Sequence, residues 1–236
     1  MHKFEMPAEY VQRTIARQGR AHTVESLDPA TTALLVVDMQ HYFMQPPYGA
    51  ACPIAQEIVP NINRLAAAMR AAGGKVVWIQ NLAPWESEQS WSVQKERLLP
   101  RNAKERWESM QRGHHGFQLW PSLEVREGDE RVIKRRYSAF IQGSSPIENV
   151  LQDHGIRTVV VTGTATNVCC ESTARDAMML NYRTVMVSDG CAAATDAEHA
   201  AALTNFYLFF GDVQTTDELV AKLQMKRAPA GALETA

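Results

Sequence analysis

The sequence contains few cysteines, and their spacing argues against two common cysteine-based architectures. Only four of the 236 residues are cysteines, two of these are adjacent, and no pair has the CxxC spacing. A disulfide framework or a cysteine zinc site requires several cysteines at characteristic spacings, so we expect neither. Free thiols are typical of a reducing compartment, and the cytoplasm is the simplest location for this protein.

The sequence also lacks a long hydrophobic run and a strong net charge. No apolar stretch reaches the roughly 20 residues that cross a bilayer, and the segment from Met1 to Pro7 contains no secretory hydrophobic region. The formal net charge of −2 at pH 7 provides no electrostatic attraction to nucleic acid or to an anionic membrane. We therefore expect a partner that is a small molecule.

The sequence does contain alternating apolar runs and amphipathic segments. Strands are expected at 33–38, 75–80, 131–134, 158–162, 183–188 and 213–216, several of them apolar runs typical of buried strands. Segments that favour helices occur at 56–72, 146–153, 168–180, 197–210 and 217–225. This alternation predicts an α/β fold in which helices cover both faces of a parallel sheet.

One domain is expected, over residues 27–227, because neither a repeat nor a linker divides the pattern. We expect residues 1–26 to form a helical extension whose helix, Pro7 to Gly19, packs across the domain or against another subunit. Residues 228–236 are expected to form a flexible tail. Between residues 81 and 128 the pattern breaks down, and four of the five tryptophans lie there. A connection of this length favours an active-site surface or a lid.

The segment from Val159 to Thr173 carries the candidate nucleophile. Its apolar run ends at Gly163, and Thr166 or Asn167 can cap the helix that follows. Cys169 would then lie in the first helical turn, where the helix dipole and unpaired N–H groups favour an anion. We therefore expect the pKa of this thiol to lie below the value of about 8.5 of a free cysteine.

The neighbouring Cys170 is expected to be a core residue, because a helix turns it about 100° away from Cys169. An alternative function is a redox or ligand-binding protein that uses this vicinal pair. Adjacent cysteines form only a strained disulfide, so we favour the nucleophile.

Two other reactive groups stand where predicted strands end. Asp38 ends the first strand, and Lys134 ends the third. Taken singly, Asp38 could cap a turn, and Lys134 could belong to a solvated charge run. Together with Cys169 they supply a thiol, a carboxylate that can move its proton, and a cation that can hold both anions. Because the carboxyl ends of parallel strands meet at one edge of a sheet, we expect the three groups to meet there. The complete set weighs against a non-catalytic scaffold.

Three blocks of the sequence resemble a known family, the isochorismatase-like cysteine hydrolases. They are Val37-Asp-Met-Gln40, Lys134-Arg-Arg-Tyr-Ser-Ala-Phe140 and Thr162-Gly-Thr-Ala-Thr-Asn-Val-Cys-Cys-Glu-Ser-Thr173. The resemblance runs from about Leu27 to Met225, with the blocks in the order and spacing of the family.

The resemblance implies a fold, a catalytic triad and an oxyanion site. The fold is a six-stranded Rossmann-like parallel sheet, and the triad would consist of Asp38, Lys134 and Cys169. A cis peptide that does not involve proline is implied at Thr164–Ala165. The backbone N–H groups of Ala165 and Cys169 would form the oxyanion hole.

The resemblance also indicates a reaction class. Family members that cleave isochorismate lack the nucleophilic cysteine, so Cys169 argues against that reaction. Nicotinamidases carry a histidine-containing metal site after the second strand, where this sequence has Asn81-Leu-Ala-Pro-Trp-Glu86. We therefore expect no metal or other cofactor, and we expect His41 to be a hydrogen-bonded loop residue. The blocks at 136–140 and 165–169 are most similar to the ureidoacrylate amidohydrolase branch.

We expect hydrolysis of a linear amide or ureido C–N bond through a thioester on Cys169. Asp38 would move the protons, and Lys134 would stabilise the thiolate. Candidate pocket residues, each of which could equally be core, are Phe43, Asn81, Trp85, Tyr137 and Phe140. The pair His114-His115 could line the entrance, although an exposed loop is the simpler interpretation. We also expect a homo-oligomer, either a dimer or a tetramer.

Overall fold

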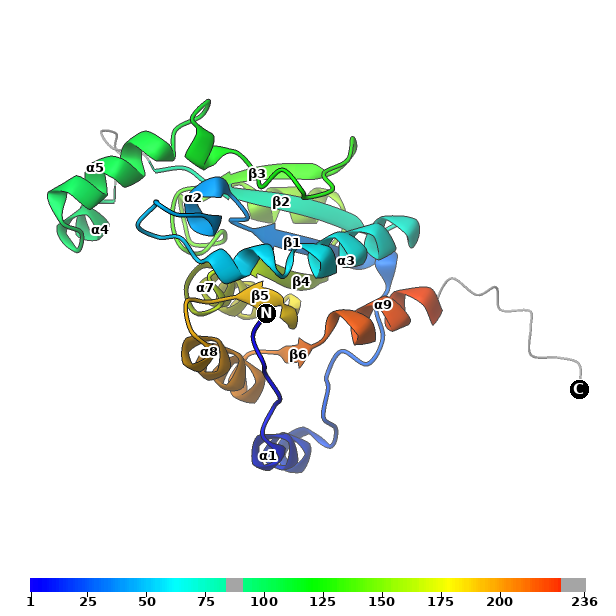
Figure 1. Ribbon diagram of the computed structural model, residues 1–236. Helices are drawn as coiled ribbons and strands as arrows, with labels where there is room; N and C mark the ends of the chain where they lie inside the picture. The colour runs from blue at the N-terminus through cyan, green and yellow to red at the C-terminus, as the bar shows by residue number, and fades with distance from the viewer. Residues whose placement is uncertain (84–90, 226–236) are drawn as a thin grey trace, which may run out of the picture.

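The computed structural model describes residues 1–83 and 91–225, and one six-stranded sheet forms its centre (Figure 1). The strands are β1 (Thr32–Val37), β2 (Lys75–Asn81), β3 (Glu130–Lys134), β4 (Thr158–Thr164), β5 (Arg183–Ala192) and β6 (Asp212–Gln214). All neighbouring strands are parallel, in the order β3-β2-β1-β4-β5-β6. The predicted six-stranded parallel sheet is therefore confirmed. Its strand order reverses between β1 and β4, which is where such sheets form a binding crevice.

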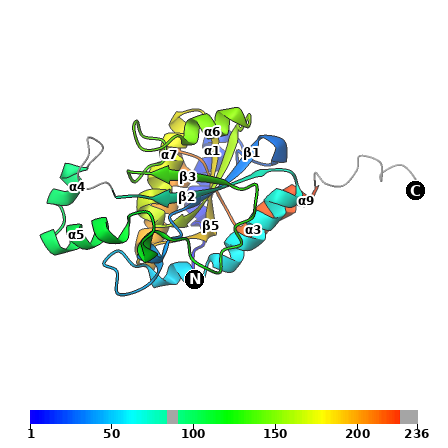
Figure 2. The ribbon, with the colours of Figure 1, turned by 90° about the horizontal axis from the view of Figure 1, so that it is seen from above.

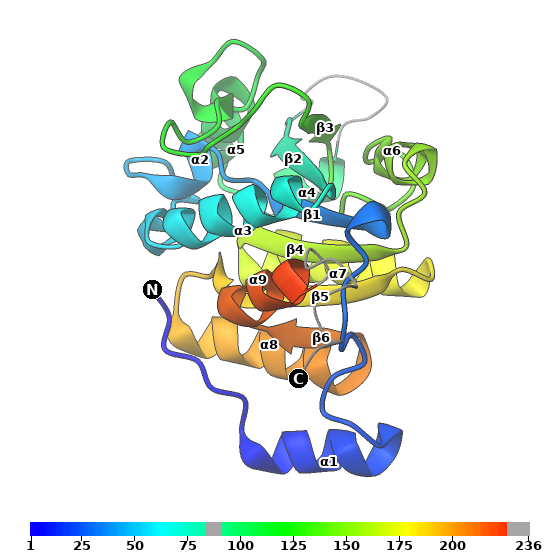
Figure 3. The same cartoon turned by 90° about the vertical axis from the view of Figure 1, so that its right-hand side faces the viewer.

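Helices cover both faces of the sheet (Figure 3). On one face lie α3 (Val59–Ala71) and α9 (Thr216–Met225), and on the other lie α6 (Ile147–Asp153), α7 (Glu171–Met179) and α8 (Asp196–Phe209). Within the described ranges, no helix combines the length and the apolar character needed to span a bilayer.

The side chains of strand β1 contribute to the hydrophobic cores on both faces of the sheet. All six of its residues are buried. Leu35 and Val37 belong to the core beneath α6, α7 and α8, whereas Leu34 and Val36 belong to the core beneath α3 and α9. This division follows from the two-residue period of a strand, and it explains why β1 is apolar from Ala33 to Val37.

Gly163 allows β1 and β4 to approach closely at their carboxyl ends. It lies opposite Val37 in the parallel register and has a φ of 116°. A Cβ atom at this position would collide with the carbonyl oxygen of Val37. Only glycine fits both the backbone conformation and the space, so this residue determines how near Asp38 comes to the turn after β4.

Two of the predicted boundaries that differ from the structure lie next to the site. The fifth strand was expected to end at Ser188, but β5 continues to Ala192 after a register shift against β4. Ser188-Asp-Gly190 resembles a strand end because the irregularity places polar and small residues inside the strand. The helix expected from Val168 begins instead with a π-helical turn, η4 (Thr166–Cys170), and α7 follows at Glu171.

The N-terminal segment packs against the same chain. Its helix α1 (Ala8–Gln18) ends at Gly19, which has a left-handed conformation. Thr14 is buried, Arg17 donates a hydrogen bond to the carbonyl of Leu208, and the Tyr207 hydroxyl donates one to Ala21 O at 2.8 Å. Of the two packing arrangements considered for this helix, the structure contains the one across the domain, on α8.

The segment between β2 and β3 forms short helices outside the sheet. These are α4 (Ser92–Glu96), α5 (Pro100–Ser109) and η3 (His115–Phe117), and Figure 2 shows α4 and α5 projecting beyond one end of the sheet. The short α2 (His41–Met44) contacts η3. Gln40, just before α2, donates a hydrogen bond to Phe117 O at 2.9 Å. The insertion is thereby attached to the end of β1.

Candidate active site

Asp38, Lys134 and Cys169 meet at the carboxyl ends of β1, β3 and β4. Lys134 Nζ lies 2.7 Å from Asp38 Oδ2 and donates a hydrogen bond to Arg136 O at 2.9 Å. Asp38 and Lys134 are fully buried, and Cys169 is 5% exposed. The structure therefore brings together the three groups that the sequence predicted to meet.

The backbone at Asp38 adopts an uncommon conformation. Its φ of 54° lies in the left-handed region, which aspartate occupies more readily than most residues. The Asp38 N–H donates to Ile79 O at 2.9 Å, and its carbonyl accepts from the Gln40 N–H at 2.8 Å. These bonds on both sides of the peptide fix the direction in which the carboxylate leaves the end of β1.

Cys169 lies in the π-helical turn η4, which follows β4 directly. The Thr164–Ala165 peptide that leads into this turn is cis, as expected. The prediction that Thr166 or Asn167 caps the helix was wrong, because no side chain caps this turn or α7. The Thr166 hydroxyl is instead buried and hydrogen-bonded to His199 Nδ1 at 2.9 Å.

The pKa of Cys169 differs from the prediction. Burial raises it to about 12, and the Asp38 carboxylate adds to the rise, whereas Lys134 only partly opposes it. The argument from the helix dipole failed because the loss of water around the sulfur outweighs the nearby positive charge. The resting form of Cys169 is therefore a thiol.

The ion pair beside Cys169 is electrostatically unusual. Burial raises the pKa of the Asp38 carboxyl, although Lys134 opposes this rise. Burial also disfavours the charged form of Lys134, but Asp38 and Cys169 outweigh it and raise the pKa of this amine. Asp38 is thus a stronger base than an exposed aspartate, and Lys134 keeps its proton.

Cys170 has a different environment from that of its neighbour. It is fully buried, and its Sγ lies 3.7 Å from Thr162 O. Burial raises the pKa of this thiol well above its ordinary value, and the contact with Cys191 adds to the effect. All four cysteines are free. Cys170 is therefore a core residue, as the helix geometry suggested.

A cavity of about 280 Å³ opens in front of Cys169. Its sheet side is formed by Thr164, Ala165, Val168 and Cys169, and further walls come from Tyr42, Phe43, Gly49, Ala50 and Tyr137. The insertion closes the remaining side with Gln94, Leu98, Asn102, Glu105 and Arg106. Such a mixture of apolar walls and a few polar groups is typical of a site for a small molecule.

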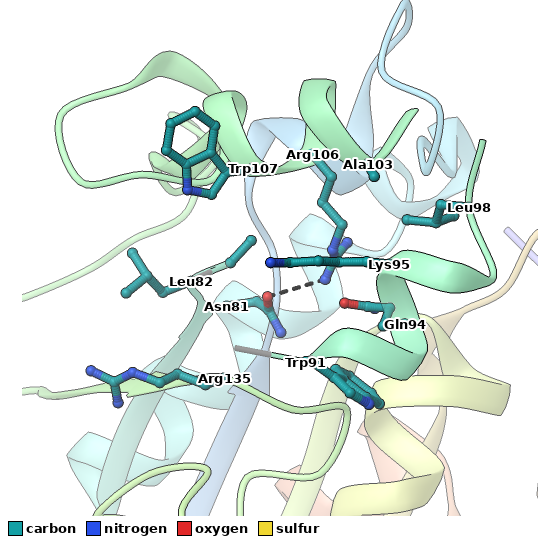
Figure 4. Close-up of a pocket in the computed structure, with 11 residues that line it drawn as sticks. Asn81, Leu82, Trp91, Gln94, Lys95, Leu98, Ala103, Arg106, Trp107 and Arg135 are labelled. Carbon is teal, nitrogen blue, oxygen red and sulfur yellow. Dashed lines mark hydrogen bonds between the residues drawn. The ribbon is translucent and has the colours of Figure 1, made fainter. Parts of the chain in front are cut away.

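The predicted pocket residues have different positions. Phe43 and Tyr137 line the cavity. Asn81 lines an adjoining hollow, where its side chain faces Arg106 (Figure 4). Phe140 is a core residue, and its ring lies 5.7 Å from that of Tyr182. Core packing was the alternative to a pocket position for this residue. Trp85 lies outside the described residues.

Two of the histidine rings, those of His41 and His115, are in tilted contact, and neither residue lines the cavity. The His41 ring lies 3.9 Å from that of His115 and 4.9 Å from that of Trp120. Burial and the neighbouring His115 lower the pKa of His41. His114 is exposed. Over residues 1–83 and 91–225, no three His, Cys, Asp or Glu side chains are grouped so that they could hold a metal ion.

Comparison with known proteins places this arrangement in a family. A model of the isochorismatase domain matches residues 32–218. The chain belongs to the isochorismatase family. The predicted family resemblance is thereby confirmed, and the matched residues include all six strands of the sheet.

Relatives of this isochorismatase-family chain include several named ureidoacrylate amidohydrolases. The RutB protein of Methylobacterium radiotolerans is 34% identical over 224 residues, which cover 88% of this chain and 85% of the relative. The RutB protein of Caulobacter vibrioides is 34% identical over 206 residues, covering 80% of this chain and 90% of the relative.

Solved structures of the family have the same fold. A cysteine hydrolase from Pseudomonas syringae pv. phaseolicola is 27% identical, with a TM-score of 0.76 over 85% of this chain and 95% of that one. An N-carbamoylsarcosine amidase from Thermoplasma acidophilum is 26% identical, with a TM-score of 0.63 over 79% of this chain and 97% of that one.

Several cavity residues of this isochorismatase-family chain were not predicted from its sequence, and one of these is the positively charged Arg106. Arg106 lies in the last turn of α5 and lines the cavity together with Asn102 and Glu105 of the same helix face. The helix contains five charged residues among ten, so its sequence resembles that of a fully solvated helix. The proline at its start indicates a helix, but nothing in the sequence indicates which cation faces Cys169.

Proposed function

We propose that this chain is a cysteine-dependent amidohydrolase that cleaves a linear amide or ureido C–N bond of a small molecule. The observation that carries the proposal is the Cys169 thiol, which faces a cavity beside the buried ion pair of Asp38 and Lys134. The names of the relatives, ureidoacrylate amidohydrolase and N-carbamoylsarcosine amidase, support the same reaction class. The enzyme is thus a hydrolase of carbon–nitrogen bonds other than peptide bonds.

In the first half of the reaction, Cys169 becomes acylated. Because the resting group is a thiol, Asp38 takes its proton as the sulfur attacks the carbonyl carbon. The carbonyl oxygen gains the negative charge, which the N–H groups of Ala165 and Cys169 would stabilise. When the C–N bond breaks, Asp38 gives the proton to the departing nitrogen, and a thioester remains.

In the second half, water removes the acyl group. Asp38, again a carboxylate, takes a proton from water as the water oxygen attacks the thioester carbon. The C–S bond then breaks, the sulfur recovers a proton, and the acid product leaves. The raised pKa of Asp38 suits both halves, because a stronger base takes a proton more readily. Lys134 stabilises negative charge on the carboxylate and on the sulfur as it passes between them.

The alternative of a redox protein based on the vicinal pair has no support. Both thiols are free, and Cys170 faces Thr162 O in the core while Cys169 faces the cavity.

The experiment that tests the proposal compares the two adjacent cysteines. Cys169→Ala should abolish ammonia release from ureido acids and simple amides, because no thioester can form. Cys170→Ala should leave the chemical step within about tenfold and lower stability by about 1 kcal/mol, since it removes only a small buried group. With the wild type, rapid quenching and mass spectrometry should find the acyl group on the peptide that contains Cys169. Full activity of Cys169→Ala, or an adduct on Cys170, would contradict the assignment.

We also propose that the enzyme is a cytoplasmic homo-oligomer. Its free cysteines suit a reducing compartment, and Met178, Met179 and Leu180 form an exposed apolar group at the end of α7. Sedimentation velocity of the purified chain would measure the subunit number, and cell fractionation would test the location. A monomer at every concentration, or recovery outside the cytoplasm, would contradict the corresponding part.

A further inference from the structure

Arg106 brings a positive charge to the wall of the cavity. Its Nη2 donates to Asn81 Oδ1 at 3.2 Å, which is a bond to a neutral amide. Its Nε is buried and has no hydrogen-bond partner among the described residues. Across residues 1–83 and 91–225, no carboxylate forms an ion pair with this guanidinium. An arginine in a partly closed site is stabilised when an anion completes its hydrogen bonds.

The surroundings of Arg106 hold its side chain in place. The guanidinium carbon lies 5.6 Å from the ring centroids of both Tyr42 and Phe43, close enough for cation–π contacts. Asn81, which is 2% exposed, is itself fixed because its backbone N–H donates to Gln40 Oε1 at 2.7 Å. Figure 4 shows the arginine extending from α5 towards Asn81. A surface arginine that is exposed to solvent would not be held by two aromatic rings and a buried amide.

Arg106 also lies on the wall that faces the nucleophile. It lines the same cavity as Cys169, and its charge acts on both Asp38 and Cys169. The cavity volume of about 280 Å³ suits one small molecule, so a substrate attacked by Cys169 also meets Arg106.

We propose that the substrate carries a carboxylate and that Arg106 binds this carboxylate while Cys169 attacks the ureido or amide carbon. This inference rests on the proposed amidohydrolase function and adds the substrate class. A guanidinium offers a planar fork that matches a carboxylate, and Arg106 brings this group to the wall of the cavity that contains Cys169.

Glu105 limits the number of negative charges that a substrate can carry into the cavity. It lines the cavity beside Arg106, and its Oε1 accepts a hydrogen bond from the Gly49 N–H at 3.2 Å. A second carboxylate on the substrate would meet this negative charge, and the other described residues of the insertion that line the cavity, Gln94, Leu98 and Asn102, carry no positive charge. The site therefore favours a monoanion over a dianion.

The first experiment measures substrate preference in the wild type. The probes are ureidoacetate, 3-ureidopropionate and 4-ureidobutanoate, each paired with a neutral N-alkylurea of matching length that has no second cleavable amide, and ureidosuccinate as the dianion. We expect kcat/KM to be at least about 30-fold higher for the best monoanion than for its neutral partner, from a charge-assisted hydrogen-bonded pair. Equal rates for acid and neutral partner, or a preference for ureidosuccinate, would overturn the proposal.

The second experiment assigns the preference to Arg106. In Arg106→Gln, kcat/KM for the monoanion should fall by about 30-fold or more, mainly through KM, whereas the neutral partner should change by less than about threefold. Arg106→Lys should restore part of the preference. Arg101→Gln is the matched control, since it removes an exposed cation from the same helix and should behave like the wild type. An equal loss for both substrates would show that Arg106 acts on the triad and not on the carboxylate.

A binding measurement separates this inference from the proposed function. In the Cys169→Ala background, calorimetry should detect 3-ureidopropionate, and adding Arg106→Gln should weaken its affinity by about 30-fold or more. If the carboxylate binds through Arg106 but the wild type releases no ammonia from any probe, the amidohydrolase proposal fails and the anion site stands. If ammonia is released but neither assay depends on Arg106, the anion site fails and the amidohydrolase proposal stands.

Discussion

At the scale of single residues, the active-site thiol depends on its neighbours for reactivity. Burial leaves Cys169 protonated, with a pKa of about 12, and the same burial makes Asp38 a stronger base. The two effects have one origin, which is the exclusion of water from the carboxyl ends of β1 and β4. Reactivity then arises when the proton moves from sulfur to carboxylate during attack, and no thiolate has to be present beforehand.

This arrangement predicts an unusual pH profile for a cysteine enzyme. Only the ionised Asp38 can accept a proton, so kcat/KM should fall as pH decreases, with an apparent pKa above the ordinary 3.8 of aspartate. With a thiol pKa of about 12, no rise attributable to Cys169 ionisation should occur near pH 8. Steady-state rates from about pH 4 to about pH 10 would record this profile. A rate that increases with a pKa near 8 would show that a preformed thiolate is the active species.

His199, which supports the nucleophile turn through Thr166, should make stability depend on pH. Burial and the charge of nearby His2 lower the pKa of His199 to about 4, against about 6.5 in the unfolded chain. Between these values the unfolded chain binds the extra proton, so the folded state loses up to about 3 kcal/mol as pH falls from about 6.5 to about 4. The full contribution is present above about pH 6.5.

Urea unfolding at several pH values would measure this slope. His199→Gln should flatten it, because glutamine does not titrate. His114→Gln, at an exposed position, should leave it unchanged. An identical slope in the wild type and His199→Gln would assign the pH dependence to other groups.

At the scale of elements, the strands were far more predictable than the turns between them. Apolar runs rich in β-branched residues marked β1, β2, β4 and β5, because burial on both faces favours such residues. The π-helical turn η4 was missed, since the residues that form it, Thr166–Cys170, have no local pattern that distinguishes it from an ordinary helical turn. The extension of β5 was missed because a register shift against β4 has no local sequence pattern.

The close approach of β1 and β4 makes Gly163 a sensitive position. Gly163→Ala should destabilise the fold by about 3 kcal/mol or more, since a Cβ would meet the Val37 backbone in addition to the cost of a positive φ. Gly155→Ala is the control, because Gly155 also has a positive φ, of 65°, but has open space around it. It should lose only about 1 kcal/mol. Urea midpoints would compare the two, and equal losses would show that the strand contact tolerates a methyl group.

At the scale of the whole molecule, the proposed catalytic groups of the site could be predicted from the sequence, whereas their electrostatic environment could not. Asp38, Lys134 and Cys169 could be anticipated because each follows or ends a predicted strand. The raised pKa of Cys169 could not, since it depends on the water that the walls of the cavity exclude. Arg106 could not either, because only the docking of α5 decides which of its charges faces inward.

The activity of the whole enzyme should not require a metal. A thiol, a carboxylate and an amine already provide the nucleophile, the proton carrier and the charge stabilisation. In the described part of the chain, moreover, no three metal-ligating side chains are grouped. Dialysis against EDTA should therefore leave kcat/KM unchanged. A loss of activity that zinc or manganese restores would contradict this prediction.

The placement of α4 and α5 outside the sheet has a consequence for evolution and engineering. The groups proposed to break the bond belong to the sheet ends, whereas Arg106 belongs to a segment inserted between β2 and β3. Such an insertion can be exchanged, lengthened or recoded with little disturbance to the hydrogen bonds that join the strands. Enzymes with the same catalytic groups could thus acquire different substrate specificities by changing this insertion. A transplanted α4–α5 segment would transfer its substrate specificity to the recipient enzyme.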